Sequence, residues 1–208
     1  MSAARIVVLV SGGGSNLQAL LDASASGRLG AVIVAVFSDR REAFGLERAR
    51  RAGVEARYRP FGPVRDAGGT REDYDAALAA EIEALAPDLV VCAGWMRVLS
   101  RAFLDRFGSR VVNLHPALPG EYPGTHAIER AWRDAAAGLR DHTGVMVHVV
   151  IPEIDAGPVL ATARVPILPG EALDALEARV HATEHALLVG AVADYLISLR
   201  GADAPRGA

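Results

Sequence analysis

Short apolar runs rich in β-branched residues alternate with segments of helical pattern through the first half of this 208-residue chain. The apolar runs predict buried strands at residues 5–11, 31–38, 54–58, 89–93 and 110–115. The helical patterns predict helices at 17–25, 43–51 and 71–85, and a brief one capped by Ser100. Such alternation is typical of an α/β fold with a doubly wound, mostly parallel sheet, which binds ligands beyond the carboxyl ends of its strands.

The pattern changes after Gly124. A helix is expected over residues 125–137, but the apolar runs at 145–150 and 159–165 have no helix between them. Two successive strands without a crossover helix predict an antiparallel pair at the edge of the sheet. A long helical segment, expected over residues 171–199, then follows.

Composition excludes several classes of function. The chain contains no lysine, so all 22 of its basic residues are arginine, which excludes a Walker-type phosphate loop, Schiff-base chemistry and a lysine general base. A net charge of -3 gives no reason to expect nucleic acid or an anionic membrane as a partner. The sequence has no apolar run of about eighteen residues that would predict a membrane span. Because Cys92 is the only cysteine, a disulfide framework is excluded and a cytoplasmic location is expected.

A glycine-rich segment, Gly12-Gly13-Gly14-Ser15-Asn16, lies between the first predicted strand and the first predicted helix. Free backbone N–H groups and the helix dipole attract an anion at such a junction. Leu17 stands where the dinucleotide fingerprint needs its third glycine, which weakens Asp39 as a ribose-binding acid and favours a phosphate monoester. We expect Asn16 to cap the helix, and the side chains of Ser15 and Asn16 to bind the phosphate. The alternative is a tight turn that binds no ligand.

An amide, an imidazole and a carboxylate follow later strands. Asn113 and His115 close the strand predicted at 110–115, and Asp155 lies near the start of another turn. A carboxylate beside His115 would raise the pKa of the imidazole and favour its charged form. A cationic imidazole beside an amide donor suits the oxyanion that forms when an acyl carbon is attacked. Without a nucleophile elbow, direct acyl transfer is favoured; the alternative is that these residues only cap turns.

One motif points to a different chemistry. His181, Glu184 and His185 match the H-x-x-E-H pattern of a group of zinc proteases. A catalytic zinc needs a third protein ligand, and no Glu, His or Cys follows His185 in the sequence. We therefore expect no metal site, and we expect Glu184 to face a polar cleft.

From residue 5 to about residue 186 the chain resembles the phosphoribosylglycinamide formyltransferases, folate-dependent enzymes of purine biosynthesis. The segments that carry the resemblance are Val-Ser-Gly-Gly-Gly-Ser-Asn-Leu-Gln, Ala-Phe-Gly-Leu-Glu-Arg-Ala, Ala-Gly-Trp-Met-Arg-Val-Leu-Ser, Asn-Leu-His-Pro and Asp-Ala-Gly-Pro. The resemblance implies a Rossmann-like formyltransferase fold. It also implies direct transfer of the formyl group of 10-formyltetrahydrofolate to the amine of glycinamide ribonucleotide, through a tetrahedral intermediate and without a metal.

The resemblance implies roles for individual residues as well. Asn113, His115 and Asp155 match the catalytic set of the family. The residues that match the ribonucleotide-binding positions are Gly14, Ser15, Asn16, Leu17, Gln18 and Glu184, the last of these for the ribose hydroxyls. Folate contacts are implied for Arg71, Met96, Arg97, Val98, Leu99, Asn113, Ile151 and Asp155, with backbone groups around Met96 and Leu99 recognising the pterin.

On this basis we expect a single formyltransferase domain over residues 1–208. It would have a nucleotide-binding half over about 1–112, a catalytic and folate-binding half over about 113–200, and a frayed end at 200–208. In the expected mechanism Asn113 and His115 stabilise the oxyanion, Asp155 keeps His115 charged, and a water relays protons. We expect small-molecule partners, and either a monomer or a homodimer.

Other activities stay open as alternatives. Methionyl-tRNA formyltransferases and formyltetrahydrofolate hydrolases share this chemistry but commonly add a further domain, which is not expected here. Sugar-nucleotide formyltransferases are a further alternative, although the glycine-rich segment fits a phosphoribosyl substrate better. The alternative from another class is a nucleotide-binding module without catalytic activity. At Ala117–Gly120 and at Ala156 this sequence departs from the residues usual in the phosphoribosylglycinamide formyltransferases.

Overall fold

The computed structural model describes residues 3–202, and over these residues it forms a seven-stranded sheet of order β3-β2-β1-β4-β5-β6-β7. The first five strands in this order are parallel to one another. They are β1 (Ala4–Val10), β2 (Ala31–Ser38), β3 (Glu55–Tyr58), β4 (Leu89–Cys92) and β5 (Val111–His115). The predicted α/β class with a doubly wound, mostly parallel sheet is therefore confirmed.

The last two strands of the sheet run antiparallel to their neighbours, as predicted. β6 (His142–Val149) pairs with β5, and β7 (Val159–Pro166) pairs with β6 at the edge. The register of β5 and β6 places Asn113 opposite His148 and His115 opposite Met146. Since side chains two residues apart on a strand share a face, Asn113, His115 and His148 lie on the same face of the sheet.

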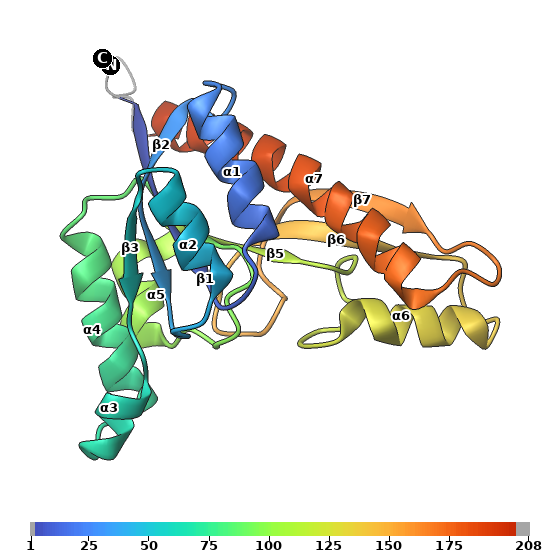
Figure 1. Ribbon diagram of the computed structural model, residues 1–208, viewed down its shortest axis with the longest axis horizontal. Coiled ribbons are helices and arrows are strands. Elements are labelled where there is room, and N and C mark those ends of the chain that lie inside the picture. The colour runs from blue at the N-terminus through green and yellow to red at the C-terminus, as the bar shows by residue number, and fades with distance from the viewer. Residues whose placement is uncertain (1–2, 203–208) are drawn as a thin grey trace.

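Helices cover both faces of the sheet (Figure 1). One core lies beneath α1 (Ser15–Ala25), α2 (Phe44–Arg51), α6 (Ala127–Ala136) and α7 (Leu173–Ala202). A second core, on the other face, lies beneath α4 (Arg71–Glu83) and α5 (Arg101–Phe107). The remaining short helices are α3 (Gly62–Asp66), which the sequence did not predict, and the 3₁₀ turn η1 (Gly108–Arg110).

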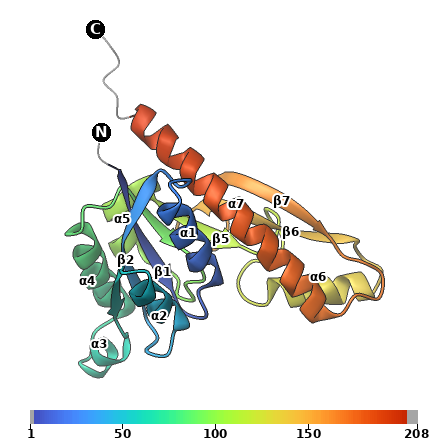
Figure 2. The same ribbon diagram turned by 45° about the horizontal axis from the view of Figure 1, so that its top comes forward.

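The helix α7 links the two ends of the sheet (Figure 2). It packs against α1 near the parallel strands and against β6, β7 and α6 at the antiparallel end. By length and composition alone it could span a membrane, with a mean hydropathy of 1.2 over its most apolar window. Its side chains Leu176, Val180, Leu188 and Val192 are nonetheless buried in the core that it shares with α1.

Several predicted boundaries differ from those observed. The helix expected over 125–137 begins only at Ala127, because His126 has the left-handed φ of 59° and cannot be part of a right-handed helix. Residues 200–202, expected as part of a frayed end over 200–208, continue α7. The rest of that segment lies outside the described residues.

The strand order places the predicted functional segments at one edge of the sheet. Successive crossovers run from β1 to β2 and β3 on one side, and the chain then returns to β4 on the other side of β1. The carboxyl ends of β1 and β4 therefore flank a topological switch point, where open α/β sheets bind ligands. The glycine-rich segment follows β1, residues 94–99 follow β4, and Asn113 and His115 end β5.

Candidate active site

The centre of the candidate site is a pair of side chains on the neighbouring strands β5 and β6. His148 donates from Nδ1 to the carbonyl oxygen of Val149 at 2.9 Å, so its Nε2 can accept from Asn113 Nδ2 at 3.2 Å. His148 is 2% exposed. The imidazole of His148 therefore fixes the orientation of the Asn113 amide.

Asp155 reaches this pair from the loop that joins β6 and β7. Its φ of 52° is left-handed, and the loop is pressed so closely on the sheet that a Cβ at Gly157 would lie 1.8 Å from the carbonyl oxygen of Val149. Asp155 Oδ2 accepts from the backbone N–H of Gly124 at 2.8 Å and lies 3.3 Å from His115 Nδ1. Its Oδ1 lies 3.4 Å from Asn113 Nδ2 and 3.6 Å from the ring of His148. The structure thus brings Asn113, His115 and Asp155 together.

Charge is distributed differently from the sequence-based expectation. Burial lowers the pKa of His115 below its ordinary value, although the charge of Asp155 and a hydrogen bond to the backbone of Tyr122 act to raise it. The Asp155 carboxylate acts in the predicted direction, but the His115 side chain is only 5% exposed, and desolvation of the cation outweighs that contribution to the pKa.

The carboxyl group of Asp155 shows the opposite balance. Burial acts to raise its pKa, but the nearby His148 side chain, the hydrogen bond from the Gly124 N–H and the nearby His115 ring together lower it below the ordinary value. Asp155 is thus a carboxylate at neutral pH. The site consists of a stabilised carboxylate facing an imidazole that is readily neutral.

His148 was not singled out by the sequence analysis. It lies in an otherwise apolar stretch of β6, and its partner depends on the register between two antiparallel strands, which the sequence does not specify. The only signal available was its place on the same strand face as Met146, and that signal does not distinguish a functional from a structural histidine.

The glycine-rich segment forms the turn into α1. Gly14 is the N-cap of this helix, with a φ of 71°, and a Cβ on it would lie 2.7 Å from the Cα of Gly45 in α2. The first amides of α1 have no carbonyl within the helix to bond, and its first turn carries no acidic side chain. Ser15, Leu17 and Gln18 occupy this turn, which suits an anion.

The predicted role of Asn16 as helix cap is wrong. The cap is Gly14, and no side chain bonds the free amides of the first turn. Asn16 Nδ2 instead donates to Glu184 Oε2 of α7 at 3.0 Å, which leaves its buried Oδ1 without a partner. Asn16 lies inside α1, one residue past its start, and its side chain contacts α7 rather than the turn.

Glu184 is a buried acid that joins α7 to the glycine-rich turn. It is 4% exposed, and its Oε2 accepts from Asn16 and also lies 2.8 Å from His181 Nδ1. The hydrogen bond to Glu184 raises the pKa of His181. Over residues 3–202 no group of three or more His, Cys, Asp or Glu side chains is arranged to hold a metal ion.

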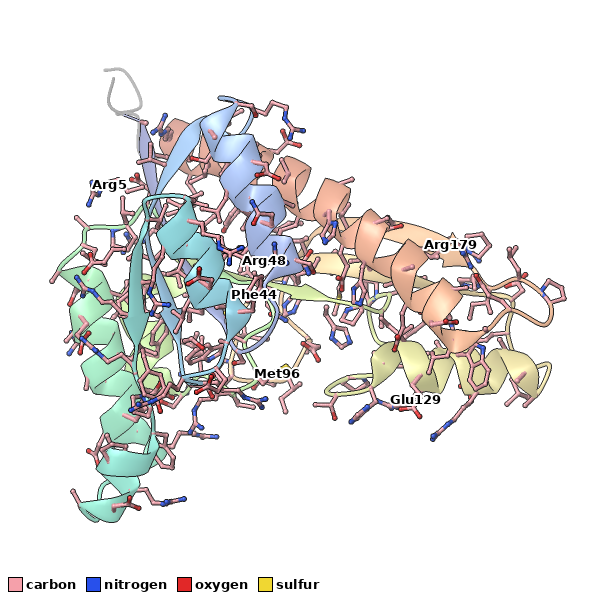
Figure 3. The ribbon with its side chains drawn as sticks, in the orientation of Figure 1. Arg5, Phe44, Arg48, Met96, Glu129 and Arg179 are labelled. Atoms are coloured by element: carbon pink, nitrogen blue, oxygen red, sulfur yellow. The ribbon has the colours of Figure 1, made fainter. Side chains whose placement is uncertain are left out.

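Arg48 of α2 lies against the glycine-rich turn and was missed by the sequence analysis. Its Nε donates to the carbonyl oxygen of Gly13 at 2.8 Å and its Nη1 to Gln18 Oε1 at 3.1 Å. The guanidinium is 5.0 Å from the centre of the Phe44 ring, and Figure 3 shows the two side chains beside the start of α1. Arg48 therefore adds positive charge to an anion-binding turn.

Ser11 links the ends of three strands at the switch point. Its hydroxyl donates to Asp39 Oδ1 at 2.6 Å and accepts from the backbone N–H of Met96 at 2.9 Å. Asp39 is thus occupied by a structural bond. The Met96 N–H, which was expected to recognise the pterin, is already used by Ser11.

The residues expected to bind folate line the same edge but differ in exposure. Met96 and Val98 are 56% and 42% exposed, whereas Leu99 is buried. The guanidinium of Arg97 lies 4.5 Å from the ring centre of Phe61 and 5.2 Å from that of Tyr74.

Two contacts relate the start of α4 to this segment. Asp75 of α4 accepts from the Ser100 N–H at 2.7 Å, which ties the helix that begins at Arg71 to residues 96–99. Arg71 itself is exposed and lies 3.4 Å from Glu72. Ile151 is half-buried at the start of the loop that carries Asp155. Exposed apolar side chains near arginines suit a flat, partly anionic ligand.

Comparison with known proteins identifies the family. The sequence profile described as formyl transferase matches residues 4–192. The phosphoribosylglycinamide formyltransferase of Schizosaccharomyces pombe is 46% identical over 199 residues, which cover 91% of this chain and 95% of that protein. The enzyme of the same name from Escherichia coli is 44% identical over 182 residues, covering 88% and 82%.

A solved structure agrees with both sequence comparisons. Glycinamide ribonucleotide transformylase 1 from Symbiobacterium toebii is 38% identical, with a TM-score of 0.86 over 94% of this chain and 89% of that one. The profile match over residues 4–192 spans all seven strands, so it includes the switch point and the strands that carry Asn113 and His148. The chain belongs to the formyl transferase family, among the phosphoribosylglycinamide formyltransferases.

Proposed function

We propose that this enzyme transfers the formyl group of 10-formyltetrahydrofolate to the amine of glycinamide ribonucleotide, in purine biosynthesis in the cytoplasm. The observation that carries the proposal is the meeting of Asn113, His115 and Asp155 at the same sheet edge as an anion-binding turn. The relatives are named phosphoribosylglycinamide formyltransferases, which supports the same formyl acceptor here.

The ribonucleotide phosphate is assigned to the turn at Gly14, Ser15, Leu17 and Gln18. Amides at the start of α1 would hold its oxygens, with the guanidinium of Arg48 as countercharge. Glu184 is assigned to the ribose hydroxyls, since a carboxylate can accept from both hydroxyls. Asn16 acts indirectly in this arrangement, because its amide holds Glu184 in place.

The folate is assigned to the edge formed by residues 96–99 and by the loop that starts at Ile151. The exposed side chains of Met96 and Val98 fit the apolar faces of a fused ring. Arg71 and Arg97 fit the carboxylates at the other end of a folate. With the Met96 N–H used by Ser11, recognition of the pterin falls to the remaining backbone groups of this segment.

In the proposed mechanism the substrate amine attacks the formyl carbon directly. Of the two hydrogens on Asn113 Nδ2, one is held by His148, and the other makes only a long contact of 3.4 Å with Asp155. That second hydrogen is the one available to the developing oxyanion. No covalent enzyme intermediate is formed.

His115 exchanges the proton in this scheme. A neutral His115 accepts the proton that the attacking amine loses, directly or through a water. The oxyanion and Asp155 then both stabilise the imidazolium, since nearby negative charge raises a histidine pKa. The same proton is returned to the folate nitrogen as the carbon–nitrogen bond breaks.

The test is formyl transfer with purified protein, glycinamide ribonucleotide and 10-formyltetrahydrofolate, measured as release of the deformylated folate. We expect release only when the ribonucleotide is present, and a loss of ~10²–10³ in kcat for His115→Ala. His142→Ala is the matched control, because His142 pairs with Asp141 at the start of β6 and should leave kcat unchanged.

The other outcomes separate the alternatives. Release without the ribonucleotide would identify a formyltetrahydrofolate hydrolase. Release only with an amino-sugar nucleotide would identify a different acceptor. If no acceptor supports release and His115→Ala binds ligands as wild type does, the proposed activity is wrong and a non-catalytic binding role is favoured.

A further inference from the structure

The loop between β5 and α6 contains a backbone conformation that side chains rarely adopt. Tyr122 has a φ of 45°, in the left-handed region, although it is not a glycine. A residue persists in this region only where surrounding contacts hold it, and such residues concentrate at functional sites. The contacts of Tyr122 therefore indicate what the strained conformation achieves.

The backbone of the Tyr122-Pro123-Gly124 turn contacts both residues of the His115–Asp155 pair. The carbonyl oxygen of Tyr122 lies 3.1 Å from His115 Nε2, at hydrogen-bonding distance. The Gly124 N–H donates to Asp155 Oδ2 at 2.8 Å, and that same oxygen faces His115 Nδ1 at 3.3 Å. This three-residue turn thus contacts His115 at one ring nitrogen. It also contacts the carboxylate oxygen of Asp155 that faces the other ring nitrogen.

The side chain of Tyr122 fastens this turn to α6 and to the segment that follows it. Its hydroxyl donates to the carboxylate of Asp134. The guanidinium groups of Arg130 and Arg140 lie 5.1 Å and 4.7 Å from the centre of its ring. Arg130 also donates to the carbonyl oxygen of Pro123 at 2.9 Å. We call Tyr122, Arg130, Asp134 and Arg140 the Tyr122 clamp.

We propose that Tyr122 is a positioning residue for formyl transfer, whose clamped carbonyl selects the tautomer of His115. With the hydrogen of the neutral ring held on Nε2, the nitrogen that gains and loses the proton is Nδ1, which faces Asp155. The inference rests on the proposed roles of His115 and Asp155. The side chain acts at a distance, since its ring and hydroxyl contact α6 and Arg140 and only its backbone contacts His115.

The sign of the expected effect follows from the groups around His115. These are Asp155, His148 on β6 and the backbone of Glu121 and Tyr122. Burial lowers the pKa of His115, and the hydrogen bond to the Tyr122 carbonyl is one of the contacts that oppose this shift. Releasing the carbonyl should therefore lower the pKa of His115 further and move the acid limb of the kcat–pH profile to lower pH.

The experiment compares Tyr122→Leu, which loses the ring and the hydroxyl, with Tyr122→Phe, which loses only the hydroxyl. We expect kcat to fall ~10- to 100-fold in Tyr122→Leu, with the acid limb displaced and with KM for the ribonucleotide changed less than about twofold. Tyr122→Phe should lie between this variant and wild type. Tyr195→Phe is the matched control, because its hydroxyl bonds the Ser109 carbonyl at 3.0 Å, and it should behave as wild type.

A second readout is independent of catalysis. Nitrogen-15 chemical shifts of the histidine rings should show the hydrogen of neutral His115 on Nε2 in wild type and a mixture of tautomers in Tyr122→Leu. This measurement stands even if formyl transfer is not the reaction, so failure of the proposed function and failure of this inference are distinguishable. Asp134→Asn, read in the same way, replaces Tyr122→Leu if that variant does not fold.

Two results would overturn the proposal. One is a folded Tyr122→Leu with the kcat, pH profile and ring shifts of wild type. The other is a loss of kcat that follows thermal stability alone, with the acid limb and the His115 tautomer unchanged, because that is what a purely structural contact would produce.

Discussion

Replacing Gly14 with alanine tests the close approach of α1 and α2 at the anion-binding turn. Two costs are expected together. Alanine at the observed φ of 71° is left-handed, and its Cβ would lie 2.7 Å from the backbone Cα of Gly45, which no side-chain rotation can relieve. The helices must therefore separate.

The magnitude follows from these two terms. A left-handed alanine costs ~1–2 kcal/mol, offset by ~0.4–1 kcal/mol because alanine also restricts the unfolded chain. Forcing a methyl group into a packed contact costs a further ~1–3 kcal/mol. We expect Gly14→Ala to lose ~2–4 kcal/mol of unfolding free energy. This corresponds to a fall in Tm of ~5–15 °C for a chain of this length.

Two matched glycines separate the terms in a thermal denaturation series. Gly27 has a similar φ of 77°, but a Cβ there would meet no atom within 4 Å, so Gly27→Ala should lose only ~1 kcal/mol. Gly13 has neither a left-handed φ nor a neighbour within 4 Å, and Gly13→Ala should stay within ~0.5 kcal/mol of wild type. The reasoning is refuted if Gly14→Ala is no less stable than Gly27→Ala.

Three further predictions concern the site. In steady-state assays, Arg48→Gln should raise KM for the ribonucleotide ~10-fold with little change in kcat. Arg51 stacks on the same Phe44 ring but pairs with Glu47, so the control Arg51→Gln should leave both constants unchanged. Asn113→Ala should lower kcat ~10²–10³-fold; an effect confined to KM would exclude it as an oxyanion donor. Folding lowers the pKa of His115 below its ordinary value of 6.5. As pH falls below 6.5, the unfolded chain therefore binds a proton at His115 before the folded chain does. The free energy of unfolding should decrease over this pH range. Urea titrations from pH 7.5 to 5 should show this loss in wild type and a smaller one in His115→Gln.

The sequence was sufficient for the architecture because the strands of a buried parallel sheet are continuous apolar runs. The run from Ile6 to Val10 and the run from Leu89 to Cys92 need no partner to be recognised, and their alternation with helices implies crossover connections. Asn113 and His115 could be singled out for the same reason. Polar side chains that directly follow such a run lie at the carboxyl edge of the sheet, where ligands bind.

What the tertiary structure alone decided was which groups from distant segments meet, and how their burial changes their chemistry. The register of β5 and β6 placed His148 against Asn113, and the packing of α2 on the glycine turn brought Arg48 to Gly13. The sequence shows a carboxylate partner for His115 but not the loss of water around its ring, which lowers the pKa of the imidazole. Local patterns are set by residues a few positions apart, whereas desolvation and pairing depend on the full three-dimensional surroundings.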